Sequence, residues 1–191
     1  MTLQELDLET MLAQIGQAPP TISGSTAALV AAQLGTVMVR MALAVSHKHG
    51  SDTDLLIEWL DSILSKIKQA TENDRVASTA LIETYRENAE PSARSLALTN
   101  ATREPLACAH LLIELLEALE DAPGNIANSV ASDFHGGVEL ISAALKAVMM
   151  AVENNLLRDG AEELRARTSY NRSTLLIRLD AAVTRLQPKK S

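Results

Sequence analysis

The stretch 25–45 constrains the fold of this chain more than any other part of the sequence. It contains no proline and is apolar on almost every side, which predicts a helix that neighbouring elements bury. Its polar residues recur at every seventh position: Thr26, Gln33, Arg40 and His47. Because seven residues make nearly two helical turns, these side chains share one narrow stripe. The stripe is expected either to face solvent or to line a cleft.

A membrane span is the obvious alternative for 25–45, because the run is about as long as a bilayer requires. Arg40 and Gln33 lie near its middle, where a charged or polar side chain is costly in lipid. The other predicted helices carry ordinary charged faces. We therefore expect a protein that does not span a membrane.

Composition favours helices throughout. Apolar residues make up 47% of the 191 residues but aromatic residues only 2%, so the core is built from Ala, Leu, Val, Ile and Met. Glycine and proline are few, which leaves long uninterrupted runs. We predict an all-α fold, a long-helix bundle with two buried central helices, forming one domain over 1–191. The net charge of −7 argues against nucleic acid as a partner, because phosphate binding requires a basic surface.

Two features bear on compartment and metal binding. The single cysteine, Cys108, lies among leucines and alanines, which predicts a buried thiol in a reducing environment. The first residues lack the basic and apolar regions of a signal peptide, so a cytoplasmic location is expected. His47 and His49 form an incomplete metal site, and no metal is expected.

Helix boundaries follow from caps and breaks. Thr2 and Glu5 form a capping-box pattern that predicts a first helix ending by Gly16. Ser25 or Thr26 is expected to cap the central helix after the loop 18–24. Pro105 is expected to bend a helix or to begin a new one. The remaining helices are expected at 54–88, 91–121, 138–157 and from about 161 to 186.

Asp74 is the first residue that stands out on physical grounds. It lies seven residues from both Ile67 and Leu81, on the apolar face of the predicted helix 54–88. A carboxylate there costs free energy unless it is paired, hydrogen-bonded or functional. A salt bridge to a neighbouring helix is the structural alternative to a functional role.

Asp133 is the second candidate carboxylate. Ser132 or Asp133 can cap the second central helix, whose dipole favours a negative charge at its start. The glycines at 136 and 137 would let a ligand or another helix approach closely. The start of the first central helix, with Gly24, is likewise a ready site for an anion or a polar ligand, and plain capping, which every helix needs, is the structural alternative.

These motifs together resemble the cyclodeaminase/cyclohydrolase family, whose members are formiminotetrahydrofolate cyclodeaminase domains and methenyltetrahydrofolate cyclohydrolases. The resemblance spans nearly the whole chain. The matching segments are Gly24-Ser25-Thr26 at the family's glycine-rich loop, Asn73-Asp74 at its acidic patch, Ala101-Thr102-Arg103-Glu104-Pro105-Leu106, Val130-Ala131-Ser132-Asp133, and a late asparagine at 154 or 155.

The resemblance implies an all-helical homodimer that binds a small-molecule folate in a cleft near the subunit contact, with no metal or other cofactor. Asp133 is the first candidate for the catalytic carboxylate and Asp74 the second. Gly24, Ser25, Thr26 and Ser132 would bind polar edges of the ligand. Lys48 would contact its glutamate tail.

The chain departs from the family at two places. Ile22-Ser23-Gly24-Ser25-Thr26 stands where the family has Pro-Gly-Gly-Gly-Ser, so that only Gly24 of the glycine triplet is kept, and His47-Lys48-His49 replaces a lysine cluster. Two hypotheses follow. The chain is either a one-carbon folate enzyme, a cyclohydrolase or a cyclodeaminase, or a diverged, inactive paralogue that serves as a ligand-binding or protein-interaction dimer. A cleft holding both Asp74 and Asp133 would favour the enzyme, and neutralisation of Asp74 by Arg40 would favour a structural role.

Overall fold

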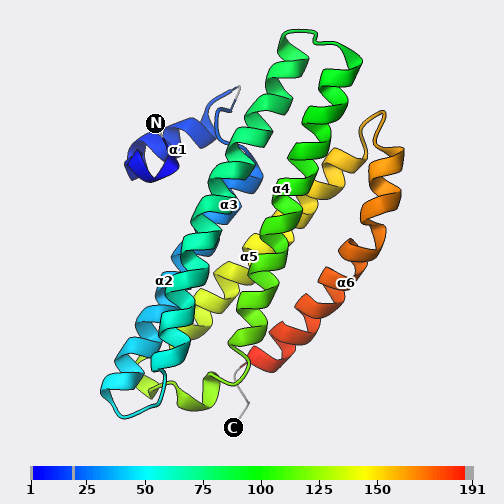
Figure 1. Cartoon of the computed structure of the whole chain (residues 1–191). Helices are drawn as coiled ribbons and strands as arrows, with labels where there is room; N and C mark the ends of the chain where they lie inside the picture. The colour runs from blue at the N-terminus through cyan, green and yellow to red at the C-terminus, as the bar shows by residue number, and fades with distance from the viewer. Residues whose placement is uncertain (1, 19, 188–191) are drawn as a thin grey trace.

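The computed structural model describes residues 2–18 and 20–187 and contains, within them, six α-helices and no strand (Figure 1). The helices are α1 (Leu8–Gly16), α2 (Gly24–Lys48), α3 (Asp54–Arg86), α4 (Pro91–Ala118), α5 (Ala131–Leu156) and α6 (Glu162–Leu186). A short 3₁₀ turn at Leu3–Glu5 precedes α1, and two more, at Pro123–Asn125 and Asn128–Val130, lie between α4 and α5. The all-helical prediction is therefore confirmed. Pro19, in the predicted loop 18–24, and residues 188–191 lie outside the described residues.

The two central helices cross at a pair of glycines. A Cβ atom placed on Gly35 of α2 would lie 2.6 Å from the backbone oxygen of Gly137 of α5, and the reverse distance is also 2.6 Å. Real Cβ atoms do not approach backbone oxygens so closely. Glycine at both positions thus lets α2 and α5 run antiparallel in backbone contact, behind α3 and α4 in the view of Figure 1. The predicted close approach at 136–137 is made by another helix.

The polar stripe of α2 pairs with α3. Each of its four residues meets a polar partner further back along the antiparallel helix: Thr26 with Asp74, Gln33 with Thr71, Arg40 with Asp61, and His47 with Asp54. Pairing begins in buried surroundings at Asp74 and ends at exposed side chains near the α2–α3 turn. We call this row the α2–α3 seam. The stripe therefore faces α3, with Gln33 at the wall of a cavity and the side chains of Arg40 and His47 partly exposed to solvent.

Helices α4 and α6 complete the core. α4 runs through Pro105 without a break, packed against α3 and α5. α6 lies outside α4 and α5 and buries a stripe that includes Leu175 and Leu179. Arg178 of α6 binds both carboxylate oxygens of Glu117 on α4, at 2.8 and 2.7 Å. α6 is thus a peripheral helix, held on the outside of the bundle by a buried apolar stripe and an ion pair.

Three expectations about helix ends are corrected. The N-terminal segment forms a 3₁₀ turn at Leu3–Glu5 and then the separate α1, because Asp7 accepts a hydrogen bond from the Thr10 amide and starts a new helix. Ser23 caps α2 in place of Ser25 or Thr26. α5 begins at Ala131, with Val130 in the cap position and no side-chain cap. Ser132 and Asp133 therefore lie inside the first turn of α5.

Two helical stretches, Gly24–Lys48 and Asn128–Leu156, are long and apolar enough to cross a membrane by length and composition. The core helices of a bundle pass the same test. In the structure these stretches supply the α2–α5 pair, and the bundle buries 39% and 50% of their most apolar windows.

Candidate functional site

The first turn of α2 presents three hydroxyl groups. The Thr26 amide donates a hydrogen bond to Ser23 Oγ at 3.2 Å, which is the helix cap. Because Ser23 serves as the cap, the hydroxyls of Ser25 and Thr26 are released from that role and turn toward α3. All three hydroxyls lie together, with Ser23 Oγ 3.0 Å from Ser25 Oγ and 2.8 Å from Thr26 Oγ1.

Asp74 of α3 receives these hydroxyl groups. It is fully buried, as its position on the apolar face of the helix predicts. Thr26 Oγ1 donates to its Oδ2 at 2.6 Å, and Ser25 Oγ donates to the same oxygen at 3.0 Å. No cation pairs with Asp74 among residues 2–18 and 20–187. Arg40 pairs with Asp61 instead, so Asp74 is not the half of a buried salt bridge.

The surroundings of Asp74 change its acidity. Removal from water raises the pKa of the Asp74 carboxyl above its ordinary value, because burial penalises the charged form. The hydrogen bonds from Thr26, Ser25 and Ser23 offset part of this effect, and the negative charge of Glu104 adds to it. The result is a carboxyl group that holds a proton more readily than an exposed aspartate does.

A cavity of about 360 Å³ opens on the other side of Ser25. We call it the Ser25 cavity. Residues from four helices line it, and its polar members are Ser23, Ser25, Ser78, Asn154, Asn155 and Arg158. Gly24 and apolar residues such as Leu81 and Met150 complete the wall. Ser25 therefore donates its hydroxyl hydrogen to Asp74 and also lines the cavity. It connects the buried carboxyl to a space that a ligand can enter.

Pro105 fixes one wall of this cavity. Proline has no amide hydrogen, so the Ala101 carbonyl, four residues earlier in α4, lacks its usual helical donor. Asn155 of α5 fills the gap, and its Nδ2 donates to the Ala101 oxygen at 2.9 Å. Both Ala101 and Asn155 line the Ser25 cavity. The proline in the middle of α4 thus holds the late asparagine in place.

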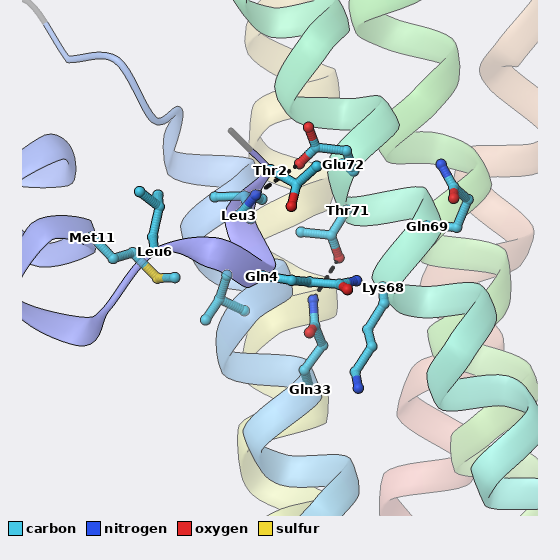
Figure 2. A pocket seen from close by; sticks show the side chains of 11 residues that line it. Thr2, Leu3, Gln4, Leu6, Met11, Gln33, Lys68, Gln69, Thr71 and Glu72 are labelled. Carbon is cyan, nitrogen blue, oxygen red and sulfur yellow. Dashed lines mark hydrogen bonds between the residues drawn. The ribbon is translucent and has the colours of Figure 1, made fainter.

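A second cavity of about 350 Å³ lies where the N-terminal segment meets α2 and α3 (Figure 2). The Leu3 amide donates to Glu72 Oε2 at 3.3 Å, and Gln33 Nε2 donates to Thr71 Oγ1 at 2.9 Å. Figure 2 shows both contacts, with Lys68 beside them. Here the polar groups bind one another and anchor the N-terminal segment. At the Ser25 cavity, in contrast, the hydroxyls of α2 stand between the cavity and the Asp74 carboxyl.

The structure brings four of the predicted site residues together: Gly24, Ser25, Thr26 and Asp74. It places the other three at the opposite end of the α2–α5 pair: Lys48, Ser132 and Asp133. Thr26 precedes the glycine crossing by nine residues and Asp133 precedes it by four on the antiparallel helix. At 1.5 Å per residue, the two ends are separated by about 20 Å. Within one chain, the expected cleft containing both Asp74 and Asp133 is therefore not formed.

Lys48 lies further still from Asp74. It is the last residue of α2 and is exposed, whereas Ser25 and Thr26 are in the first turn of that helix. A role for Lys48 in binding the same ligand as Gly24 is therefore not supported within one chain. Asp133 is half-buried in the first turn of α5, where the helix dipole favours it.

Sequence reasoning missed Ser23, Ser78 and Arg158 as cavity residues. Ser78 is one helical turn from Asp74 on α3, a spacing that could have suggested it. Arg158 follows α5 in a segment that reads as a plain break, so nothing local marks it. The thiol of Cys108 is buried as predicted, and burial raises its pKa far above the range in which a thiolate forms.

His47, in the last turn of α2, and His49, at its C-cap, do not form a metal site in the described part of the chain. His47 pairs with Asp54 at 3.3 Å, and the segments 2–18 and 20–187 contain no group of three His, Cys, Asp or Glu side chains placed to hold a metal ion.

Comparisons with family models and with solved structures both give matches, and the comparison with curated sequences gives none. The family model described as formiminotransferase-cyclodeaminase matches residues 7–172. A crystal structure of formiminotetrahydrofolate cyclodeaminase from Thermotoga maritima superposes with a TM-score of 0.86 at 17% sequence identity, covering 96% of this chain and 95% of that one. At this identity, the structural likeness establishes the fold.

Proposed function

Because the chain belongs to the formiminotransferase-cyclodeaminase family, we propose that it acts on a one-carbon derivative of tetrahydrofolate bound in the Ser25 cavity. The reaction is either closure of the formimino group with loss of ammonia, or opening of the cyclic methenyl group by water. The observation that carries the proposal is Asp74, a buried carboxyl that pairs with no cation of residues 2–18 and 20–187 and whose partner Ser25 lines the cavity. Burying such a group costs free energy, so a role in proton transfer explains its presence better than packing does.

Both reactions pass through a tetrahedral carbon between two nitrogens. In cyclodeamination, the second nitrogen attacks the formimino carbon and loses its proton, and the amino group leaves as ammonia after gaining one. In the cyclohydrolase reaction, water attacks the methenyl carbon, loses a proton, and one carbon–nitrogen bond breaks as that nitrogen is protonated. Each reaction needs one group that accepts a proton and then returns it.

Asp74 and Ser25 are suited to that task. Ser25 Oγ takes a proton from the reacting water or nitrogen. At the same time Ser25 passes its own hydroxyl proton to Asp74 over their 3.0 Å hydrogen bond. The raised pKa of Asp74 lets it hold this proton until the leaving nitrogen takes it back. The chemistry needs no resident cofactor, because acid and base groups suffice for both proton transfers.

The test measures the near-ultraviolet absorbance of methenyltetrahydrofolate, its loss in the hydrolytic direction and its appearance from formiminotetrahydrofolate. Asp74→Asn is expected to lower the rate about 10²- to 10⁴-fold, the usual contribution of a positioned acid or base. Asp133→Asn is the matched comparison and is expected to retain most of the rate. Collapse in Asp133→Asn alone would move the catalytic carboxylate to the other end of α5.

Absence of both activities in folded protein would contradict the enzymatic proposal. The alternative, a diverged paralogue that binds a ligand or a protein partner, would then stand. The two substrates are tested separately because the Ser25 cavity fits either reaction.

A homodimer is part of the proposal. The described surface of α2 carries three large apolar side chains at helical spacing, Leu34, Val37 and Met41, with exposed fractions of 56%, 41% and 39%. Burying such a row against a second copy is favourable at about 25 cal/mol per Å². Val37→Glu is expected to shift the protein toward monomer in analytical ultracentrifugation. A monomeric native protein would contradict this part of the proposal.

A cytoplasmic location is likewise expected of an enzyme of folate chemistry.

A further inference from the structure

Beyond the Ser25 cavity, a third cavity of about 610 Å³ lies between the α3–α4 turn and the α5–α6 turn. These two turns lie near each other at one end of the bundle (Figure 1). We call it the arginine cavity, because Arg94 of α4 and Arg158 of the α5–α6 turn both line it. Tyr85, at the end of α3, forms another part of its wall.

The two guanidinium groups share one aromatic ring. The central carbon of Arg94 lies 5.6 Å from the centre of the Tyr85 ring, and that of Arg158 lies 5.0 Å from it. Each contact is a cation–π interaction, which orients a guanidinium group without neutralising it. Two like charges are thus held close together, an arrangement that costs free energy until an anion joins them.

Neither arginine has a carboxylate partner in residues 2–18 and 20–187. Asp159 also lines the arginine cavity but forms no ion pair with either of them. The Nε atoms of Arg94 and Arg158 are buried and have no hydrogen-bond partner, and they are the two such side-chain atoms in the described chain. Unsatisfied buried donors are rare and costly, so their coincidence at one cavity calls for a ligand.

The α3–α4 turn helps to position Arg94. Asn88 adopts a left-handed conformation with φ of 50°, and its Oδ1 accepts a hydrogen bond from Arg94 Nη2 at 2.5 Å. Asparagine tolerates this conformation better than most residues. Arg94 is therefore held by a neutral acceptor, which leaves its positive charge available.

Arg158 also lines the Ser25 cavity, so the two cavities share a wall. A ligand whose reacting part lies beside Ser25 can extend an acidic end past Arg158 toward Arg94. Guanidinium groups bind carboxylates through paired hydrogen bonds, which suits two arginines facing one cavity.

We propose that the arginine cavity is a carboxylate-binding subsite that takes the acidic glutamyl end of the ligand of the Ser25 cavity. The identity of that ligand as a folate rests on the proposed function. The subsite replaces Lys48 as the expected contact of the acidic tail, since Lys48 lies at the far end of α2.

The test uses p-aminobenzoylglutamate, which carries the acidic end of folates and lacks the reacting ring. Its binding is measured by calorimetry on the full chain. Arg158→Gln and Arg94→Gln are each expected to weaken binding about tenfold or more, the value of one lost charge-assisted hydrogen bond. Arg167→Gln is the matched control, because its exposed side chain lies on α6 outside both cavities, and it is expected to bind like the native protein.

Both variants are expected to fold, because the Arg158 guanidinium makes no hydrogen bond or ion pair with the described residues and Arg94 makes one side-chain hydrogen bond, to Asn88. Thermal melts check this. Unchanged binding in both folded variants, or no binding to the native protein, would overturn the subsite. Inorganic phosphate is titrated in parallel, and phosphate binding that p-aminobenzoylglutamate does not displace would overturn it too.

These outcomes separate the subsite from the reaction. Turnover of a folate without arginine-dependent binding of p-aminobenzoylglutamate would leave the proposed function standing and remove the subsite. Arginine-dependent binding without turnover would do the reverse.

Discussion

At the scale of single residues, Asp74 shows how a chain can bury a carboxyl group among hydroxyl donors. Hydroxyl donors from the first turn of α2 replace the water that burial removes. They satisfy the oxygens but supply no positive charge, so the pKa of Asp74 stays raised. A neighbouring arginine would lower the pKa of the same group and fix it as a permanent anion. The hydroxyl shell is therefore what keeps Asp74 able to exchange a proton.

Sequence periodicity alone identified Asp74, because a charged residue at core spacing is a local anomaly. It could not identify the partners of Asp74, since three other polar residues share the stripe that holds Thr26. It also could not choose between Asp74 and Asp133, because both sit in plausible positions and only the tertiary packing separates them. No local pattern in the sequence marks Arg94 or Arg158, since the Tyr85 ring that both contact lies on α3, away from both of them in the sequence.

The hydrogen bond from Asn155 to the Ala101 carbonyl predicts a coupling with Pro105. Asn155→Ala leaves that carbonyl without a donor and is expected to destabilise the fold by about 1–2 kcal/mol. In a Pro105→Ala background, the restored backbone amide of residue 105 supplies the donor, so the same substitution is expected to cost close to nothing. A double-mutant cycle of urea melts measures the coupling, expected at about 1–2 kcal/mol.

Asn154→Ala is the control for this cycle, because Asn154 lines the same cavity and is exposed. It is expected to show no coupling to Pro105. Equal costs of Asn155→Ala in both backgrounds would mean that the proline does not create the acceptor that Asn155 uses.

Gly24 tests whether a ligand approaches the start of α2. A Cβ atom on Gly24 meets no atom within 4 Å, so Gly24→Ala is expected to leave thermal stability unchanged or slightly raised. The added methyl group projects from the wall of the Ser25 cavity and is expected to weaken folate binding about tenfold. Calorimetry measures it, with Gly16→Ala, in open space on α1, as the matched change. Native affinity in Gly24→Ala would place the ligand elsewhere.

At the scale of helices, the α2–α3 seam and the α2–α5 crossing divide the work of α2 between two faces. One face pairs polar groups in register with α3, and the other approaches α5 through glycine. The seam fixes how far α2 can slide along α3, because a shift of one turn would separate every pair at once. That register is what sets Ser25 and Thr26 opposite Asp74.

The heptad spacing in the sequence predicted that these polar residues share a face. It could not reveal that α3 supplies a polar partner for each of them. The antiparallel partner spacings are irregular, since the partners on α3 are 74, 71, 61 and 54. Gly35 likewise carried no signal in an alanine-rich helix, where a small residue attracts no attention until its neighbour is known.

Gly35→Ala is expected to destabilise the fold by about 3 kcal/mol, because the new methyl group would meet the Gly137 carbonyl, which is backbone and cannot turn aside. Chemical denaturation measures the loss. Gly136→Ala is the neighbouring control, since its Cβ would meet only the flexible end of Met38 at 3.4 Å. Similar costs for the two substitutions would show that the crossing has room to relax.

At the scale of the whole molecule, composition and periodicity predicted an all-helical bundle with two central helices, and long α3 and α6 were placed within a few residues of their observed ends. The connections that decide function lie between elements distant in sequence. The arginine cavity joins two turns that are some 70 residues apart, and the Ser25 cavity draws on four helices. Such juxtapositions depend on topology, which no local pattern contains.

The outer helix α6 gives the bundle a pH-dependent attachment. The hydrogen bonds from Arg178 hold the pKa of Glu117 below its ordinary value, with burial opposing them. A carboxyl whose pKa is lowered on folding contributes stability above its unfolded pKa, and this stability is lost as the pH falls through the lower folded value. The attachment of α6 to α4 is therefore expected to weaken below about pH 4.5, near the ordinary pKa of glutamate.

Glu117→Gln tests this attachment. At pH 7 the variant is expected to be less stable than the native protein by about 1 kcal/mol, the upper range for a partly exposed ion pair. As the pH falls below the folded pKa of Glu117, both proteins carry a neutral side chain there and the difference is expected to shrink toward zero. Urea melts from pH 7 to pH 3 measure it. Glu163→Gln is the control, because it removes an exposed ion pair of 3.8 Å with Arg167, and it should have the stability of the native protein at every pH. A loss of stability in Glu117→Gln that does not change with pH would mean that Glu117 stabilises α6 by packing rather than by charge.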